Sequence, residues 1–137
     1  MVINSPLKKY RSSNNIVFSC QYHVIFCPKY RRRILVGDIA EQLKKLLYSI
    51  AKDYDCKIIE CEVMPDHVHL LLDVNPNIGI KKVVARLKGN TSRILREQFP
   101  KLKSKLPCLW TNSKFISTVG SISLGVVKQY IENQRGK

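Results

Sequence analysis

The chain has 137 residues, with 24 lysines and arginines against 10 aspartates and glutamates, and so a formal net charge of +14. This length suits one domain, 1–137, and the charge favours a polyanionic partner, most simply a nucleic acid. No apolar run approaches the ~20 residues of a membrane span, and the N-terminus lacks the apolar core of a secretory signal. With an odd count of cysteines, five, these features predict a cytoplasmic protein with reduced thiols and no membrane partner.

The first half of the chain alternates between β-rich and helical patterns. A polar, basic leader over residues 1–15 precedes an apolar, β-rich run, 16–27, which predicts the first strand. Its lone His23 is interpreted as structural, outside any site. A basic loop over 29–33 is either simply solvated or, as the net charge favours, in contact with phosphates. Residues 38–54 then carry apolar side chains at helical spacing, and their first residues predict a capping box.

The second half begins with a predicted β-hairpin. Its strands, 57–63 and 67–74, are joined by the turn-forming Met-Pro-Asp. A second helix with a basic outer face, weakened by Gly89, is expected over 80–99. The segments that follow are a basic linker (100–107), short extended pieces (109–111 and 114–119) and a last helix (123–134). This order predicts an α+β, ferredoxin-like (RRM-like) β-α-β-β-α-β antiparallel sheet with helices on one face, plus a C-terminal helix.

Two of the three histidines, His67 and His69, lie two residues apart in the second hairpin strand. Strand periodicity places both imidazoles on one face and Val68, Leu70 and Leu72 on the other. Two such imidazoles can bind one cation, and a three-ligand site needs another donor from elsewhere. Ordinary strand histidines satisfied by hydrogen bonds explain the pair equally simply, so the pair by itself leaves both interpretations open.

Further motifs add a family resemblance to this pair. The chain contains Met-Pro-Asp-His-Val-His-Leu-Leu, then Leu-Trp-Thr and Phe-Ile-Ser-Thr-Val-Gly, and finally Tyr-Ile-Glu-Asn-Gln over 130–134. In this order and spacing, from about Tyr22 to Gln134, they resemble the single-tyrosine HUH transposases of the insertion sequence 200/605 type, the IS200-like transposase family. Lys114 departs from the pattern, because we expect an aromatic residue there in many relatives.

The resemblance implies a DNA transposase that cleaves and rejoins single-stranded DNA at hairpin-bearing insertion-sequence ends. Tyr130, on a C-terminal catalytic helix, would form a 5′-phosphotyrosine intermediate. His67, His69 and Gln134 would bind a divalent metal, Mg²⁺ or Mn²⁺. The resemblance also implies a homodimer in which the tyrosine helix of one subunit completes the site of the other. From charge alone, the candidate DNA contacts are Arg31, Arg32, Arg33, Lys82 and Arg86.

Two other functions stay open from the sequence. A domesticated relative that nicks palindromes would keep the same active-site residues. A non-catalytic ferredoxin-like module that binds RNA would read bases with aromatic side chains on its sheet. Such a module has no need of His67, His69 and Gln134, so indifference to their loss would favour it.

Overall fold

The computed structural model describes residues 10–119, 124–134 and 136. Its strands are β1 (Arg11–Ser13), β2 (Ile16–Phe18), β3 (Gln21–Phe26), β4 (Cys56–Met64), β5 (His67–Val74) and β6 (Phe115–Thr118). Its helices are α1 (Gly37–Asp53), α2 (Ile80–Gln98), α3 (Pro100–Lys105) and α4 (Leu124–Asn133), with a 3-10 turn, η2 (Lys29–Arg31). Within this described part of the chain, no helix has the length and apolarity to cross a membrane.

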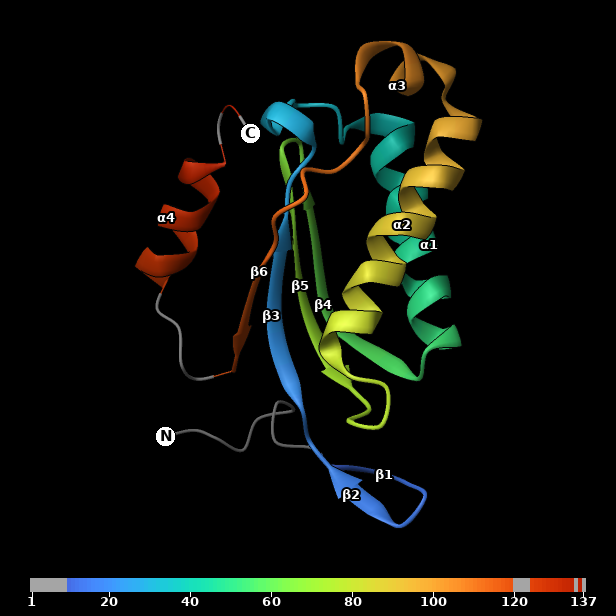
Figure 1. Ribbon diagram of the computed structural model, residues 1–137, viewed down its shortest axis with the longest axis vertical. Helices are drawn as coiled ribbons and strands as arrows, with labels where there is room; N and C mark the ends of the chain where they lie inside the picture. Colours follow the sequence, from blue (N-terminus) through green and yellow to red (C-terminus); the bar gives the residue numbers. More distant parts are fainter. Residues whose placement is uncertain (1–9, 120–123, 135, 137) are drawn as a thin grey trace.

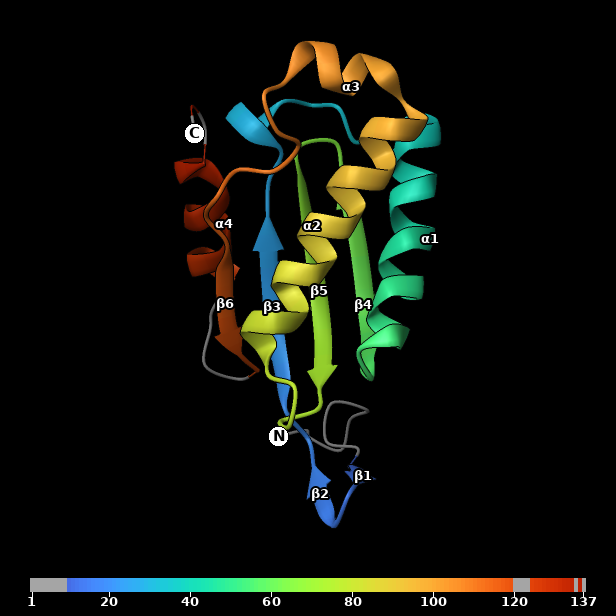
Figure 2. The same cartoon turned by 45° about the vertical axis from the view of Figure 1, so that its right-hand side comes forward.

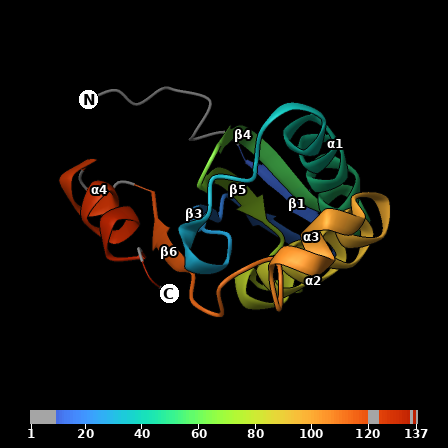
Figure 3. The same ribbon diagram turned by 90° about the horizontal axis from the view of Figure 1, so that it is seen from above.

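A four-stranded sheet in the order β4-β5-β3-β6 forms the centre of the molecule, and its neighbouring strands pair antiparallel. Helices α1 and α2 cover one face, and α4 lies on the opposite side of the sheet beside β6 (Figures 1 and 3). With β3, β4, β5 and β6 as its strands, this is the predicted ferredoxin-like β-α-β-β-α-β arrangement, with a C-terminal helix added.

The hydrophobic core fills the space between the sheet and the first two helices. Alternation along β3 and β5 sends Val24, Phe26 and Leu70 into this core, where each is fully buried. Trp110 closes one end: its ring meets Phe26 edge-on at 4.7 Å, and its indole N–H donates to a buried threonine. The core therefore fixes which face of β5 is left for the histidines.

Four local predictions were wrong. The stretch 16–27 forms two strands instead of one. The extended conformation is interrupted at residues 19–20, and β2 pairs with β1 in a separate hairpin. The same pairing makes residues 11–13 a strand, although the sequence predicted a loose leader there. Residues 100–105 are helical rather than a linker, with Pro100 in the first turn, where proline is tolerated. Helix α1 begins at Gly37 without a side-chain cap. The predicted start of the last helix, Ser123, lies outside the described residues.

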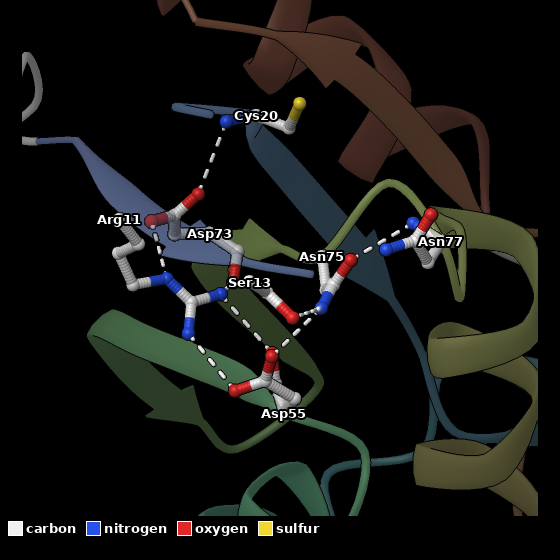
Figure 4. A network of polar contacts seen from close by, with 7 residues as sticks. All are labelled: Arg11, Ser13, Cys20, Asp55, Asp73, Asn75 and Asn77. Carbon is white, nitrogen blue, oxygen red and sulfur yellow. Dashed lines mark hydrogen bonds and ion pairs between the residues drawn. The ribbon is translucent and has the colours of Figure 1, made fainter. Parts of the chain in front are cut away.

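The β1–β2 hairpin extends beyond the end of the sheet (Figure 2) and is tied to it by a polar network (Figure 4). Arg11 donates from Nε to Asp73 Oδ2 at 3.0 Å and from Nη1 to Asp55 Oδ1 at 3.2 Å. Asp73 also accepts from the Cys20 backbone N–H, and Asn75 donates to Asp55. Because Asp73 is only 2% exposed, its charge depends on these partners.

Replacing Arg11 with methionine should lower the free energy of unfolding by about 1–3 kcal/mol, because it leaves a buried carboxylate without its cation. Urea denaturation measures this change. Arg93→Met, which removes an exposed arginine from α2, is the matched control and should change stability by less than about 0.5 kcal/mol. Equal losses in the two variants would contradict a structural role for the network.

Candidate active site

A β-bulge in β4 decides which side chains stand beside the histidines. The pairing of β4 with β5 shifts between Ile58 and Glu60, so that Ile58 lies opposite Leu72 while Glu62 lies opposite His69. Without the extra residue, strand alternation would turn Glu62 toward the core. The bulge therefore delivers a carboxylate to the face of the sheet that carries both imidazoles.

His67 begins β5, and its ring is held by the turn before it. Its Nδ1 lies 2.9 Å from Asp66 Oδ1, and Arg31 Nε donates to Asp66 Oδ2 at 3.0 Å. Burial raises the pKa of Asp66, but the hydrogen bond from His67 and the charge of Arg31 outweigh it and leave this pKa below its ordinary value. A carboxylate on Nδ1 fixes the tautomer that leaves Nε2 of His67 as a metal donor.

His69 is held in a similar way from the neighbouring strands. Its Nδ1 lies 3.4 Å from Glu62 Oε1, and its Nε2 lies 3.1 Å from Nδ1 of His23. The rings of His23 and His69 are stacked, with centroids 5.3 Å apart. Burial lowers the pKa of His23, and the nearby His69 lowers it further, while Glu60 opposes both, and the balance favours the neutral form. The structure thus places His23, interpreted from the sequence as structural, in contact with the candidate ligand His69.

The donors on this sheet face fit a divalent cation in part. The carboxylates of Asp66 and Glu62 hold Nδ1 of His67 and His69, which is the support that metal-binding histidines need. Nε2 of His69 is in contact with His23, so a cation at this atom would have to displace that contact. In the described part of the chain, no group of three His, Cys, Asp or Glu side chains is placed to hold a metal ion. The two imidazoles therefore fit a cation, but a third donor has to be of another kind or come from another chain.

Tyr130 lies on α4, at the opposite edge of the same sheet face. Its ring packs on Phe115 of β6, with centroids 5.1 Å apart. Phe115 pairs with Ile25, which pairs with His69, so two strand spacings, about 10 Å, separate Phe115 from His69. The phenolic oxygen is buried without a hydrogen-bond partner among the described residues. Burial raises the pKa of Tyr130, partly offset by nearby Ser113. The phenol is thus sheltered.

Gln134 follows α4 and is also enclosed. It is 3% exposed, and its Oε1 accepts a hydrogen bond from Ser113 Oγ at 2.7 Å. The end of α4 is held by Arg31, whose Nη1 donates to the carbonyl of Ile131 at 2.9 Å. Arg31 therefore links α4 to Asp66 and, through Asp66, to β5. The side-chain oxygen of Gln134 is already hydrogen-bonded to Ser113.

The predicted DNA contacts differ in their surroundings. Arg31 has a side chain only 11% exposed and forms the ion pair with Asp66. It and Tyr30 adopt left-handed backbone, φ 50° and 62°, at a cost of about 1–3 kcal/mol each. The exposed members of the set are Arg32, Arg33, Lys82 and Arg86. Contact with DNA stays a prediction for all five.

A basic ferredoxin-like domain that carries a histidine pair on its sheet and a tyrosine on a separate helix is the arrangement expected of a transposase that uses tyrosine. The family model described as "Transposase IS200 like" matches residues 16–134. The chain therefore belongs to the IS200-like transposase family.

Curated relatives agree with this assignment. The chain is 40% identical over 129 residues to the ISDra2 transposase TnpA of Deinococcus radiodurans, covering 93% of this chain and 92% of the relative. It is 32% identical over 119 residues to the transposase for insertion sequence element IS200 of Salmonella typhimurium, covering 85% and 78% of the two chains.

Solved structures are similar in fold. The crystal structure of a putative transposase from Deinococcus radiodurans R1 matches with a TM-score of 0.84 at 37% identity, over 93% of this chain and 99% of that chain. A REP-associated tyrosine transposase bound to a REP hairpin matches with a TM-score of 0.51 at 14% identity, over 89% and 68%. The second likeness shows the fold alone.

Replacing Asp66 with asparagine should lower the free energy of unfolding at pH 7 by about 1–3 kcal/mol, because Arg31 and His67 lose a charged partner. A carboxyl whose folded pKa is depressed stabilises the fold above its unfolded pKa, ordinarily 3.8, and this contribution is lost as the pH falls through the folded value. The gap between wild type and variant should therefore shrink below about pH 4. Urea denaturation at pH 7 and pH 3 tests this, and a constant gap would contradict it.

Proposed function

We propose that this chain is a metal-dependent HUH endonuclease and strand transferase, which cleaves and rejoins single-stranded DNA at hairpin-bearing insertion-sequence ends. The observation that carries the proposal is the pair of carboxylate–histidine contacts, Asp66–His67 and Glu62–His69, on one sheet face of an IS200-like family member. The net charge of +14 supports a polyanionic substrate.

In this proposal, the phenolic oxygen of Tyr130 attacks a phosphodiester phosphorus. A phosphorus–oxygen bond to the tyrosine forms, the bond to the 3′ oxygen breaks, and the phenolic proton passes to solvent while the leaving oxygen gains a proton as a free 3′-OH. The 5′-phosphotyrosine keeps the bond energy, so rejoining needs no ATP. Mg²⁺ or Mn²⁺ held by His67, His69 and Gln134 would supply Lewis-acid stabilisation of the phosphate charge.

The proposal includes a homodimer with a shared active site. In the arrangement described, Tyr130 packs on Phe115, two strand spacings from His69, and Gln134 accepts a hydrogen bond from Ser113. A chain in this state has to release both residues before they can join the imidazoles. Delivery of α4 to the histidine face of a second subunit satisfies that need, and it gives the metal its third donor from a neutral side chain that preserves the charge of the cation.

Tyr130→Phe and His67→Ala should each abolish covalent adduct formation, because one removes the nucleophile and the other a metal donor. Labelled single strands from both ends of the element that carries this gene are incubated with the protein and Mg²⁺ or Mn²⁺, and adducts that survive SDS are counted. Wild type should give a metal-dependent adduct on one strand of each end only.

Tyr48→Phe is the matched control, because it removes a hydroxyl from a half-exposed tyrosine on α1 and should leave the adduct intact. An adduct that persists in Tyr130→Phe would refute the assigned nucleophile. Tight binding with no adduct under any metal would refute the catalytic proposal and favour a binding module.

His23→Leu should tighten Mn²⁺ binding roughly 3- to 10-fold, because it frees Nε2 of His69 from one neutral hydrogen bond worth about 1 kcal/mol. Electron paramagnetic resonance of free Mn²⁺ measures the affinity without DNA or turnover. His67→Ala is the opposing control and should weaken binding. Weaker Mn²⁺ binding in His23→Leu would contradict the idea that His23 competes with the metal for Nε2 of His69, and it would identify His23 as a metal donor instead.

A further inference from the structure

An open groove is lined by residues of α2 and of the segment that returns from α3 to β6, and its volume is about 270 Å³. Figure 2 shows the course of these two segments. On the helix the groove is lined by Lys88, Gly89 and Ser92, and on the returning segment its polar lining is Thr111, Asn112 and Lys114. No carboxylate is among the described residues that line it.

Lys88 forms a fixed cationic point in this groove. Its ammonium donates to the carbonyl of Thr111 at 2.7 Å and to that of Ser113 at 3.2 Å. An ammonium has three N–H donors, and the two carbonyls take two of them, while Nζ also lies 5.9 Å from the centroid of the Phe26 ring. Burial, and after it the positive charge of Lys114, lower the pKa of Lys88 to about 8. Two cations thus share one space without an acidic partner, and an anion between them would turn their repulsion into attraction.

Gly89 is a second feature of the groove lining. It lies in the middle of α2, where glycine costs about 1 kcal/mol relative to alanine. A Cβ atom at this position would meet no other atom within 4 Å, so packing does not require the glycine. Glycine is the usual residue where a ligand comes close to the backbone. Its place beside the two lysines fits a groove kept open for an occupant.

We propose that this groove binds a backbone phosphate of the DNA, held by Lys88 and Lys114 above the exposed helix backbone at Gly89. The inference rests on the proposed function and adds a substrate contact to it, away from the reacting bond. The hydroxyl of Ser92 and the amide of Asn112 add neutral donors on the two walls.

The test compares Lys114→Gln with Lys45→Gln, which removes the same charge from an exposed position on α1. Binding of labelled single strands from the element ends is measured in EDTA, which prevents cleavage, over a range of salt concentrations. Each phosphate contact contributes about 0.7 to the slope of log K against log salt for a single strand. Lys114→Gln should lower the magnitude of the slope by about this amount, and Lys45→Gln should leave it unchanged.

Variants of Gly89 test the space above the helix backbone. Gly89→Ala should weaken DNA binding although it favours the helix, because its methyl group takes space that the phosphate would occupy, and Gly89→Gln is the neutral control of matched length for Gly89→Glu. Gly89→Glu places a carboxylate where the phosphate would lie, and it should weaken DNA binding several-fold more than Gly89→Gln. Equal affinity for the two longer variants would overturn the proposal.

The remaining outcomes are distinguishable. Equal salt slopes in Lys114→Gln and Lys45→Gln, with normal wild-type adducts, would overturn the groove and leave the proposed function standing. Wild type that binds no DNA would overturn both.

A last experiment uses inorganic phosphate as the probe. Thermal unfolding is measured in phosphate and in chloride at equal ionic strength. Stabilisation by phosphate that Lys114→Gln abolishes, with unchanged DNA slopes, would assign the groove to free phosphate and overturn its role with DNA.

Discussion

The site depends on the contacts of one buried carboxylate, that of Asp66. A carboxylate taken out of water costs several kcal/mol unless charged and hydrogen-bonding partners replace the solvent. Here the partners are His67 on one oxygen and Arg31 on the other, and Arg31 in turn holds the end of α4. The hairpin turn, the basic loop and the tyrosine helix are therefore coupled through one charge. This coupling explains how Tyr30 and Arg31 are kept in left-handed backbone, which would be unfavourable without a strong tertiary partner.

Much of the fold could be predicted because the information is local. The strand His67–Val74 is bounded by a turn and by Asn75-Pro76, and α2 differs from its expected end by one residue. The errors arise where tertiary pairing overrides local pattern. The pattern of 16–27 predicts one strand, but the Cys20 N–H donates to the side chain of Asp73 instead of to a neighbouring strand. Before this point β2 pairs with β1, and after it β3 pairs with β5.

The site was predictable in its residue types and less so in its contacts. The spacing of His67 and His69 gives their common face, since strand alternation is local. Glu62 could not be placed, because uninterrupted alternation turns it toward the core and only the bulge reverses this. His23 meets His69 only through the β3–β5 register, which involves residues 46 positions apart. Charge alone likewise cannot separate Arg31, which is enclosed in an ion pair, from the exposed Arg32.

Ser113 lies between the proposed phosphate-binding groove and the residues at the end of α4. Its carbonyl accepts from Lys88 on the groove side, and its hydroxyl donates to Gln134 on the α4 side. Both hydrogen bonds involve Ser113, so the position of this residue depends on Lys88 and on Gln134 together. Short polar contacts of this kind are each worth about 1 kcal/mol, which is enough to shift the population of a docked helix several-fold. The hydrogen bond from Ser113 thus helps to hold the end of α4, together with the contact of Arg31 with the carbonyl of Ile131.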